Sequence, residues 1–207
     1  YLWLYFLLLR FLFSLFSVQI LSLTSWLSSS STRCVLDDNS NDGTNRWLKK
    51  NRINYIRNRQ NLGYEKNIKK GFNYCLKKRG IKYVITFDAD GQHKVKDAIK
   101  IADELINTEY EIIFGSRFLG HAYKIPIIKR FVLRSVTAIT NFFTGMKLTD
   151  AHNGLKGFKT SAINKIDIKL DGYAYETELI RQVSEKSISY KESATDIEYS
   201  DYSTKKG

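Results

Sequence analysis

Residues 82–93 read Lys-Tyr-Val-Ile-Thr-Phe-Asp-Ala-Asp-Gly-Gln-His. The first half of this stretch is apolar, β-branched and aromatic, a pattern typical of a buried strand. The strand ends in two carboxylates, Asp88 and Asp90, and ligands of open α/β sheets bind where strands end. Together with the amide oxygen of Gln92, these carboxylates are hard ligands suited to Mg²⁺ or Mn²⁺ holding a diphosphate. Alone, the same pattern also fits an Asp-rich turn.

A second acidic cluster favours a site over a turn. Residues 34–44 read Cys-Val-Leu-Asp-Asp-Asn-Ser-Asn-Asp-Gly-Thr, so a short apolar segment again runs into carboxylates, here Asp37 and Asp38. Two strands of one sheet that both end in carboxylates indicate a ligand site at their common edge.

Strand and helix patterns alternate along the chain. Short apolar segments follow at 54–57 and 111–115, and helical stripes of apolar residues cover 64–76 and 95–106. This alternation predicts an α/β fold with a mainly parallel sheet and helices on both faces.

The chain resembles the family 2 inverting glycosyltransferases, whose fold is called GT-A. Seven segments carry the resemblance over residues 34–207: VLDDNSNDGT (35–44), NRQNLGYEKNIKKG (58–71), FDADGQH (87–93), FGSRF (114–118), LTDAHNGLKGF (148–158), YAYETELI (173–180) and IEYSDYSTKKG (197–207). The last two are most similar to bacterial, dolichol-phosphate mannosyltransferase-like members. The resemblance implies metal-dependent, inverting transfer of a sugar from a nucleotide-diphosphate donor to a polyprenyl-phosphate or saccharide acceptor in cell-surface glycan synthesis.

The resemblance also implies roles for single residues. Mg²⁺ or Mn²⁺ would be bound by Asp88, Asp90 and Gln92. The donor nucleotide would be bound by Asp37, Asp38, Gly63, Asp88 and Arg117.

Two acidic positions are candidates for catalysis. Asp150 is the candidate general base, which takes or orients the acceptor proton, and Glu176 is the next candidate. Glu176 and Glu178 are too close in sequence to share one helix face, so at most one should point into the site. The alternative for Asp150 is a helix or turn cap, and the alternative for Arg117 is an ordinary surface arginine.

The net charge of +12 and a pI near 9.6 indicate an anionic partner. No segment matches a nucleic-acid module, so we expect a phosphorylated substrate or a membrane surface rather than nucleic acid. Residues 125–143 form an amphipathic pattern that fits either a lipid-interface helix or a core-facing helix. The two cysteines lack metal-site spacing and are expected to be reduced thiols.

Residues 1–33 depart from the family pattern. They contain no Lys, Asn, Asp or Glu, and the family's first strand and P-x-x-N-E-like loop are not recognisable. We therefore expect the first βαβ unit to be degraded or missing and the catalytic domain to occupy 34–207, truncated at its C-terminus. The segment is either a disturbed reading frame or a membrane anchor in which residues 1–27 insert. The expected location is the cytoplasmic face of a membrane.

Two other classes of protein remain open. A haloacid-dehalogenase-like phosphatase also places D-x-D-G after a buried strand and uses the first Asp as nucleophile. The second is a catalytically dead, membrane-associated remnant of the glycosyltransferase family.

Overall fold

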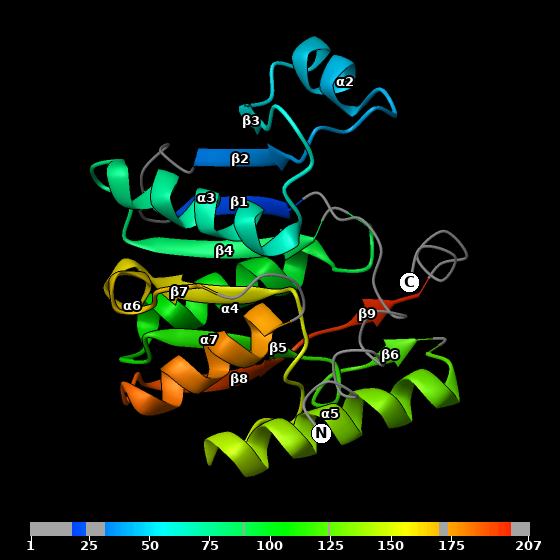
Figure 1. The fold of residues 1–207 in the computed structure, drawn as a ribbon, viewed down its shortest axis with the longest axis vertical. Coiled ribbons are helices and arrows are strands. Elements are labelled where there is room, and N and C mark those ends of the chain that lie inside the picture. Colours follow the sequence, from blue (N-terminus) through cyan, green and yellow to red (C-terminus); the bar gives the residue numbers. More distant parts are fainter. Residues whose placement is uncertain (1–17, 24–31, 89, 124, 170–173, 200–207) are drawn as a thin grey trace.

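A seven-stranded sheet forms the centre of the structure, a computed structural model that describes residues 18–23, 32–88, 90–123, 125–169 and 174–199. From edge to edge its strands are β3 (Tyr55–Arg57), β2 (Thr32–Asp37), β1 (Val18–Leu23), β4 (Tyr83–Asp88), β7 (Lys156–Lys159), β5 (Ile112–Ser116) and β8 (Tyr190–Ala194) (Figure 1). Two short strands, β6 (Ala122–Tyr123) and β9 (Ile197–Glu198), pair separately.

Strand directions place the expected site residues at one edge of the sheet. β3, β2, β4, β5 and β8 run the same way, while β1 and β7 run against their neighbours. The prediction of an α/β fold is therefore confirmed, but the sheet is mixed, because only β2–β3 and β5–β8 are parallel neighbours. Because β2, β4 and β5 end together, the acidic clusters and the segment containing Arg117 meet at this carboxyl edge.

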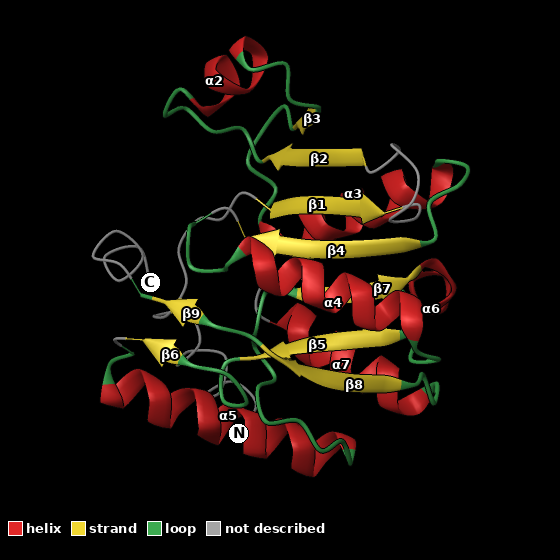
Figure 2. Cartoon of the chain, turned by 180° about the vertical axis from the view of Figure 1, so that it is seen from behind, coloured by secondary structure: helices red, strands yellow, loops and turns green. Residues whose placement is uncertain are grey.

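Helices cover both faces of the sheet, as predicted. One face is covered by α4 (Val95–Asn107), whose Ala98, Ile101, Ala102 and Leu105 are buried against β4, β5 and β7 (Figure 2). The opposite face is covered by α3 (Tyr64–Lys77), α6 (Thr160–Lys165) and α7 (Ala174–Glu185). At the two ends of the molecule lie α2 (Thr44–Lys50), beyond β3, and α5 (Ile127–Thr144), beyond β8 (Figure 1).

The first described strand, β1, is not the opening strand of a βαβ unit. β1 pairs antiparallel with both β2 and β4. Only residues 24–31 connect β1 to β2, whereas parallel neighbours need a crossover of roughly a dozen residues or more. Among the described residues, no βαβ unit precedes β2. The first described strand starts at Val18, whereas the catalytic domain was expected to start at residue 34.

Residues 1–17 and 24–31 lie outside the described residues, as does most of the segment expected to be an anchor or a disturbed frame. Among the helices that the structure describes, none combines the length and the apolar character needed to cross a bilayer.

Candidate active site

Asp88 and Asp90 lie at the end of β4. The Asp88 Oδ1 atom is 3.4 Å from the Tyr64 hydroxyl, and its Oδ2 atom is 3.8 Å from the His93 Nε2 atom. The Asp90 Oδ1 atom accepts a hydrogen bond of 3.0 Å from the Gln92 N–H group. Burial and the nearby negative charge of Asp88 raise the pKa of Asp90. A cation bound beside this pair would offset the charge of Asp88 and favour the ionised form of Asp90.

A glycine backbone packs directly against the first of these carboxylates. A Cβ atom built on Gly154 would lie 1.9 Å from the Asp88 Oδ2 atom, so a side chain there would displace the Asp88 carboxylate. The Asn153–Gly154 turn, which precedes β7, therefore holds Asp88 in place.

The donor atoms present fit a hard divalent cation. No group of three or more His, Cys, Asp or Glu side chains able to hold a metal occurs in the described ranges. Asp88 and Asp90 therefore supply only part of a coordination shell, to which the Gln92 amide oxygen can add. Mg²⁺ is commonly held in this way, by one or two carboxylates while substrate phosphates and water complete the shell.

Asp38 organises the loop that follows β3. Its Oδ1 atom accepts hydrogen bonds from Asn58 Nδ2 at 2.6 Å and from the Leu62 N–H group at 2.8 Å. Its Oδ2 atom accepts the Gly63 N–H group at 2.9 Å. The φ of Gly63 is +89°, a conformation that favours glycine.

The neighbouring Asp37 is fully buried. Its Oδ1 atom accepts the Ser40 N–H group at 2.8 Å, and its Oδ2 atom is 3.6 Å from the Arg57 Nε atom. The structure thus brings Asp37, Asp38 and Gly63 together, but both carboxylates face groups of the protein itself.

Arg117 is not presented to solvent as a phosphate ligand would be. Its backbone N–H group and its Nε atom donate to the Asp150 Oδ2 atom at 3.0 and 2.6 Å. Its remaining nitrogens donate to the Tyr199 hydroxyl at 2.8 Å and to the His152 carbonyl. The side chain is only 5% exposed. The expectation that Arg117 binds the donor nucleotide conflicts with this arrangement, because every guanidinium nitrogen already has a protein partner.

Asp150 is correspondingly enclosed. It is 1% exposed, and burial would raise its pKa, but the charge and hydrogen bonds of Arg117 outweigh burial and lower it. A buried carboxylate that is held ionised by arginine is a poor proton acceptor. The expectation that Asp150 is an accessible general base is therefore not supported by this geometry.

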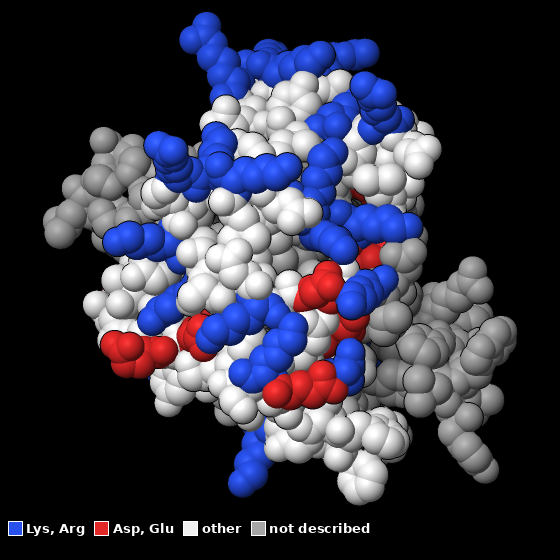
Figure 3. Space-filling model, turned by 60° about the vertical axis from the view of Figure 1, so that its left-hand side comes forward, with Lys and Arg blue, Asp and Glu red and all other residues white. Residues whose placement is uncertain are grey.

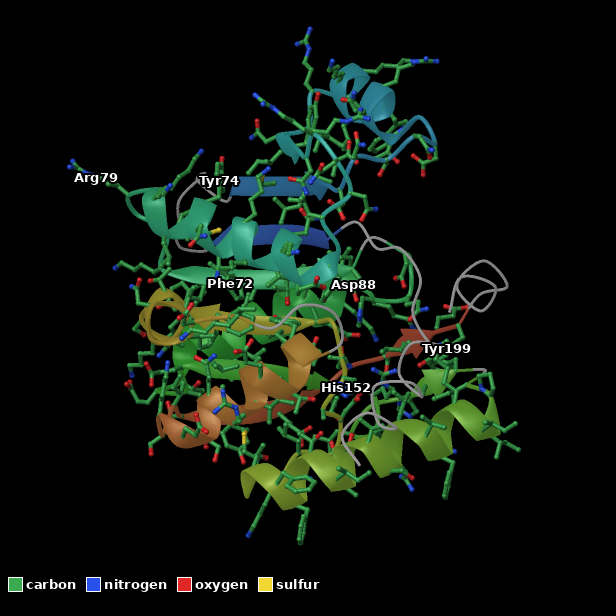
Figure 4. The ribbon with its side chains drawn as sticks, viewed as in Figure 1. Phe72, Tyr74, Arg79, Asp88, His152 and Tyr199 are labelled. Carbon is green, nitrogen blue, oxygen red and sulfur yellow. The ribbon has the colours of Figure 1, made fainter. Side chains whose placement is uncertain are left out.

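Residues 197–199, near the C-terminus, contact the loop at the carboxyl edge. The Glu198 N–H group donates to the Gln92 carbonyl at 3.1 Å, and His93 forms an isolated bridge with Ile197. Figure 4 shows Asp88, His152 and Tyr199 on the side of the molecule where β4 ends. The segment 197–199 thereby anchors the loop that carries the acidic pair, and residues 200–207 lie outside the described residues.

Glu176 lies in the first turn of α7, where its side chain is 13% exposed. Its Oε1 atom accepts a hydrogen bond of 2.8 Å from Lys156 Nζ, and its Oε2 atom is buried without a hydrogen-bond partner. Burial raises the pKa of Glu176, with a further contribution from Asp88. Glu178 instead accepts the Lys169 N–H group. Of the two glutamates, Glu176 is the one whose carboxyl group senses the charge of Asp88.

Sequence reasoning missed two residues of this cluster. Lys156 is 2% exposed and also donates to the Asn153 carbonyl, so it joins the turn beside Asp88 to Glu176. Tyr64 is partly buried and lies beside Asp88 and Tyr175. In an amphipathic segment a lysine ordinarily indicates a surface position and a tyrosine a core position. Neither residue type by itself indicates a functional site.

The sequence model of glycosyl transferase family 2 matches residues 23–167. The chain belongs to glycosyl transferase family 2. The match spans β2, β4 and β5 and therefore includes every residue of the carboxyl edge described above except Glu176, Glu178 and the C-terminal segment. This membership confirms the resemblance read from the sequence and disfavours the phosphatase alternative.

Two relatives from methanogenic archaea are similar to this family 2 chain, and one of them is named for a dolichyl-phosphate acceptor. An uncharacterized protein of Methanocaldococcus jannaschii is 32% identical over 177 residues, which cover 84% of this chain and 72% of that protein. The UDP-N-acetylglucosamine–dolichyl-phosphate N-acetylglucosaminyltransferase of Methanococcus voltae is 30% identical over 132 residues, 62% of this chain and 53% of that enzyme.

Solved structures confirm the GT-A fold. Glucosyl-3-phosphoglycerate synthase from Mycobacterium tuberculosis, in complex with Mn²⁺, UDP and phosphoglyceric acid, matches with a TM-score of 0.60 at 14% identity. The match covers 81% of this chain and 60% of that one, so this family 2 chain spans about 60% of the length of that enzyme. At this identity the likeness concerns the fold alone.

Proposed function

We propose that this chain transfers a sugar, with inversion, from a nucleotide-diphosphate donor to a polyprenyl-phosphate or saccharide acceptor in cell-surface glycan synthesis. The observation that carries the proposal is the placement of the carboxylates Asp88 and Asp90 at the end of β4, where burial, with a smaller contribution from the charge of Asp88, raises the pKa of Asp90. The dolichyl-phosphate relative supports a lipid-phosphate acceptor, and the Mn²⁺–UDP complex of the structural neighbour supports a metal-bound donor.

On the donor side, Asp88, Asp90 and Gln92 would hold Mg²⁺ or Mn²⁺. When bound, the cation supplies positive charge that offsets the charge developing on the leaving diphosphate. The loop that Asp38 ties down at Leu62 and Gly63 would form the wall against which the nucleobase rests. Asp37 would act indirectly, by fixing the start of this loop.

On the acceptor side, Glu176 replaces Asp150 as the carboxylate that faces the reacting group. Glu176 lies near Asp88, has one oxygen without a hydrogen bond, and has a raised pKa, as a general base near neutral pH requires. Asp150 would act as a positioning residue that holds Arg117 and, through it, Tyr199. A phosphate acceptor is already ionised and would need orientation rather than deprotonation.

Cations on α5 lie beside this acceptor side. The Lys129 Nζ atom is 5.1 Å from the centre of the Tyr199 ring, and burial lowers the pKa of Lys129 while Asp90 raises it. A groove of about 310 Å³ between α5 and the loops at Phe118 and Thr149 includes Arg134. We propose that an acceptor phosphate approaches between these two cations, at the cytoplasmic face of a membrane.

Product analysis tests the proposal. The full chain is incubated with Mn²⁺, polyprenyl phosphate in detergent, and UDP- or GDP-sugars in turn, and the products are resolved by mass spectrometry and by NMR of the anomeric proton. We expect a polyprenyl-phospho-sugar of inverted configuration from one donor. Hydrolysis of a phosphomonoester without sugar transfer would support a phosphatase, and no binding of any nucleotide diphosphate would support an inactive remnant.

A further inference from the structure

The outer face of α5 is apolar and uncovered in the described structure. Six large apolar side chains of this helix are between 42% and 86% exposed: Ile127, Ile128, Phe131, Ile139, Phe142 and Phe143. Its buried positions are instead Leu133, Val136, Thr137 and Thr140. The helix therefore turns two threonines inward and its largest apolar groups outward, which is the opposite of an ordinary core-facing helix. This arrangement favours the lipid-interface interpretation of segment 125–143 over the core-facing one.

The exposed groups form one continuous stripe. At 3.6 residues per turn, the six apolar positions cover an arc of about 160°. Arg130 and Arg134 are also exposed and lie along one margin of this arc. A wide apolar stripe bordered by arginine is typical of a helix that lies in the plane of a lipid interface, where the arginines reach the headgroups.

The first turn of α5 adjoins the candidate site. Lys129 faces inward toward Tyr199, whose hydroxyl accepts a hydrogen bond from Arg117, while Ile128 and Phe131 on either side of it point outward. A membrane that touches the outer face of α5 would therefore bring lipid headgroups to the entrance of the acceptor side.

We propose that the outer face of α5 docks this protein onto a lipid bilayer, with the helix lying flat and its phenylalanines among the acyl chains. The proposal deepens the proposed function, on which it rests, because it names the surface that would deliver a lipid-phosphate acceptor. We infer that a bilayer, rather than another protein, covers this face, because arginines border the apolar stripe and it adjoins a site proposed for a lipid phosphate.

A basic surface away from α5 is a second candidate for contact with a membrane. Residues 44–82 contain 13 Lys and Arg against one acidic residue, so this segment alone carries the +12 of the whole chain. Figure 3 shows Lys and Arg side chains gathered over the upper part of one face, whereas acidic side chains lie lower down, beside other cations. Because α2 and α5 lie at opposite ends of the molecule (Figure 1), substitutions at the two ends can test the two surfaces separately.

Flotation with two kinds of vesicle separates these surfaces. The full chain is mixed with phosphatidylcholine vesicles, or with vesicles that also contain phosphatidylglycerol, and the floating fraction is measured. The variant Phe131→Asp/Phe142→Asp should bind phosphatidylcholine about tenfold or more weakly, since two large apolar groups leave the bilayer. The control Val95→Asp/Tyr110→Asp, which makes the same charge change at exposed positions of α4 and its following loop, should bind like the wild type.

Three results would overturn the docking surface. The first is binding that requires phosphatidylglycerol and is lost in Lys49→Gln/Lys50→Gln/Lys77→Gln. The second is equal binding by the phenylalanine variant and the wild type. The third is a dimer in light scattering that the phenylalanine variant abolishes, because a second copy would then cover α5.

A separate readout distinguishes failure of docking from failure of the proposed function. With a short, water-soluble polyprenyl phosphate and no vesicles, the phenylalanine variant should turn over at the wild-type rate. If no variant transfers sugar, the proposed function fails, while the flotation result still decides the membrane surface.

Discussion

The Arg117 Nε atom donates a hydrogen bond of 2.6 Å to the Asp150 Oδ2 atom, and both side chains are buried. These residues lie 33 positions apart in the sequence, at the end of β5 and in the turn before β7. Because the two buried charges neutralise each other away from solvent, we expect neither side chain to contact substrate. We expect both to position the residues of the site instead.

Replacement of Arg117 tests this pairing. Arg117→Met should lower the free energy of unfolding by about 3–5 kcal/mol, because it leaves the Asp150 carboxylate buried without its cation. Arg181→Met, which breaks the exposed pair with Glu185 on α7, should cost less than about 1 kcal/mol. Urea unfolding measures both. Unchanged stability combined with a raised KM for the acceptor would show instead that Arg117 contacts the acceptor phosphate.

The two candidate carboxylates should separate kinetically. Glu176→Gln should lower kcat for a hydroxyl acceptor by about 100-fold or more while leaving donor affinity near the wild-type value, because a general base acts in the transition state. Asp150→Asn should reduce stability more than it reduces the turnover of the protein that remains folded. Steady-state kinetics at matched folded concentration gives both values, and full activity in Glu176→Gln would move the base elsewhere.

The backbone contact at Gly154 should control metal affinity. Gly154→Ala places a methyl group where the Asp88 Oδ2 atom lies, so the carboxylate must move and Mn²⁺ should bind more weakly. Gly145→Asn is the control, since asparagine tolerates the left-handed conformation at the end of α5. Manganese EPR titration measures the affinity, and equal values for Gly154→Ala and the wild type would exclude Asp88 from the metal shell.

Acid should destabilise the protein in part through His152. Burial lowers the pKa of His152 from its ordinary value of 6.5 to about 4. Between these values the unfolded chain binds a proton that the folded protein does not, so stability falls as the pH falls through this window. At about pH 5 the loss from this residue should be about 2 kcal/mol. His152→Asn should show a smaller fall in urea-unfolding stability from about pH 7 to about pH 5 than the wild type. An identical fall in both proteins would contradict the assignment.

The fold was predictable where it depends on local pattern. The apolar run before Asp88 and the helical stripe over 95–106 each carry their own periodicity, and both elements formed as expected. The reversed direction of β1 was not predictable, because strand direction depends on pairing with distant strands rather than on composition. The exposure of the apolar face of α5 was likewise not predictable, since an amphipathic pattern does not show which neighbours cover its apolar side.

The site was predictable in its location but not in its internal contacts. Asp88 and Asp90 follow a strand pattern directly, so their place at the sheet edge could be inferred. The partners of Arg117 come from two other segments, the loop that contains Asp150 and His152 and the segment that contains Tyr199, and its burial depends on how those segments meet. Lys156 was missed because a buried lysine is rare and only its contact with Glu176 explains it.

The most direct test of the account is a thermal-shift measurement with UDP and GDP, each with and without Mn²⁺, on the wild type and on Asp90→Ala. We predict that one of the nucleotides raises the Tm of the wild type only when Mn²⁺ is present, and that Asp90→Ala keeps its own Tm but loses this increase. An equal Mn²⁺-dependent increase in Asp90→Ala would contradict the joint binding of metal and diphosphate at the end of β4.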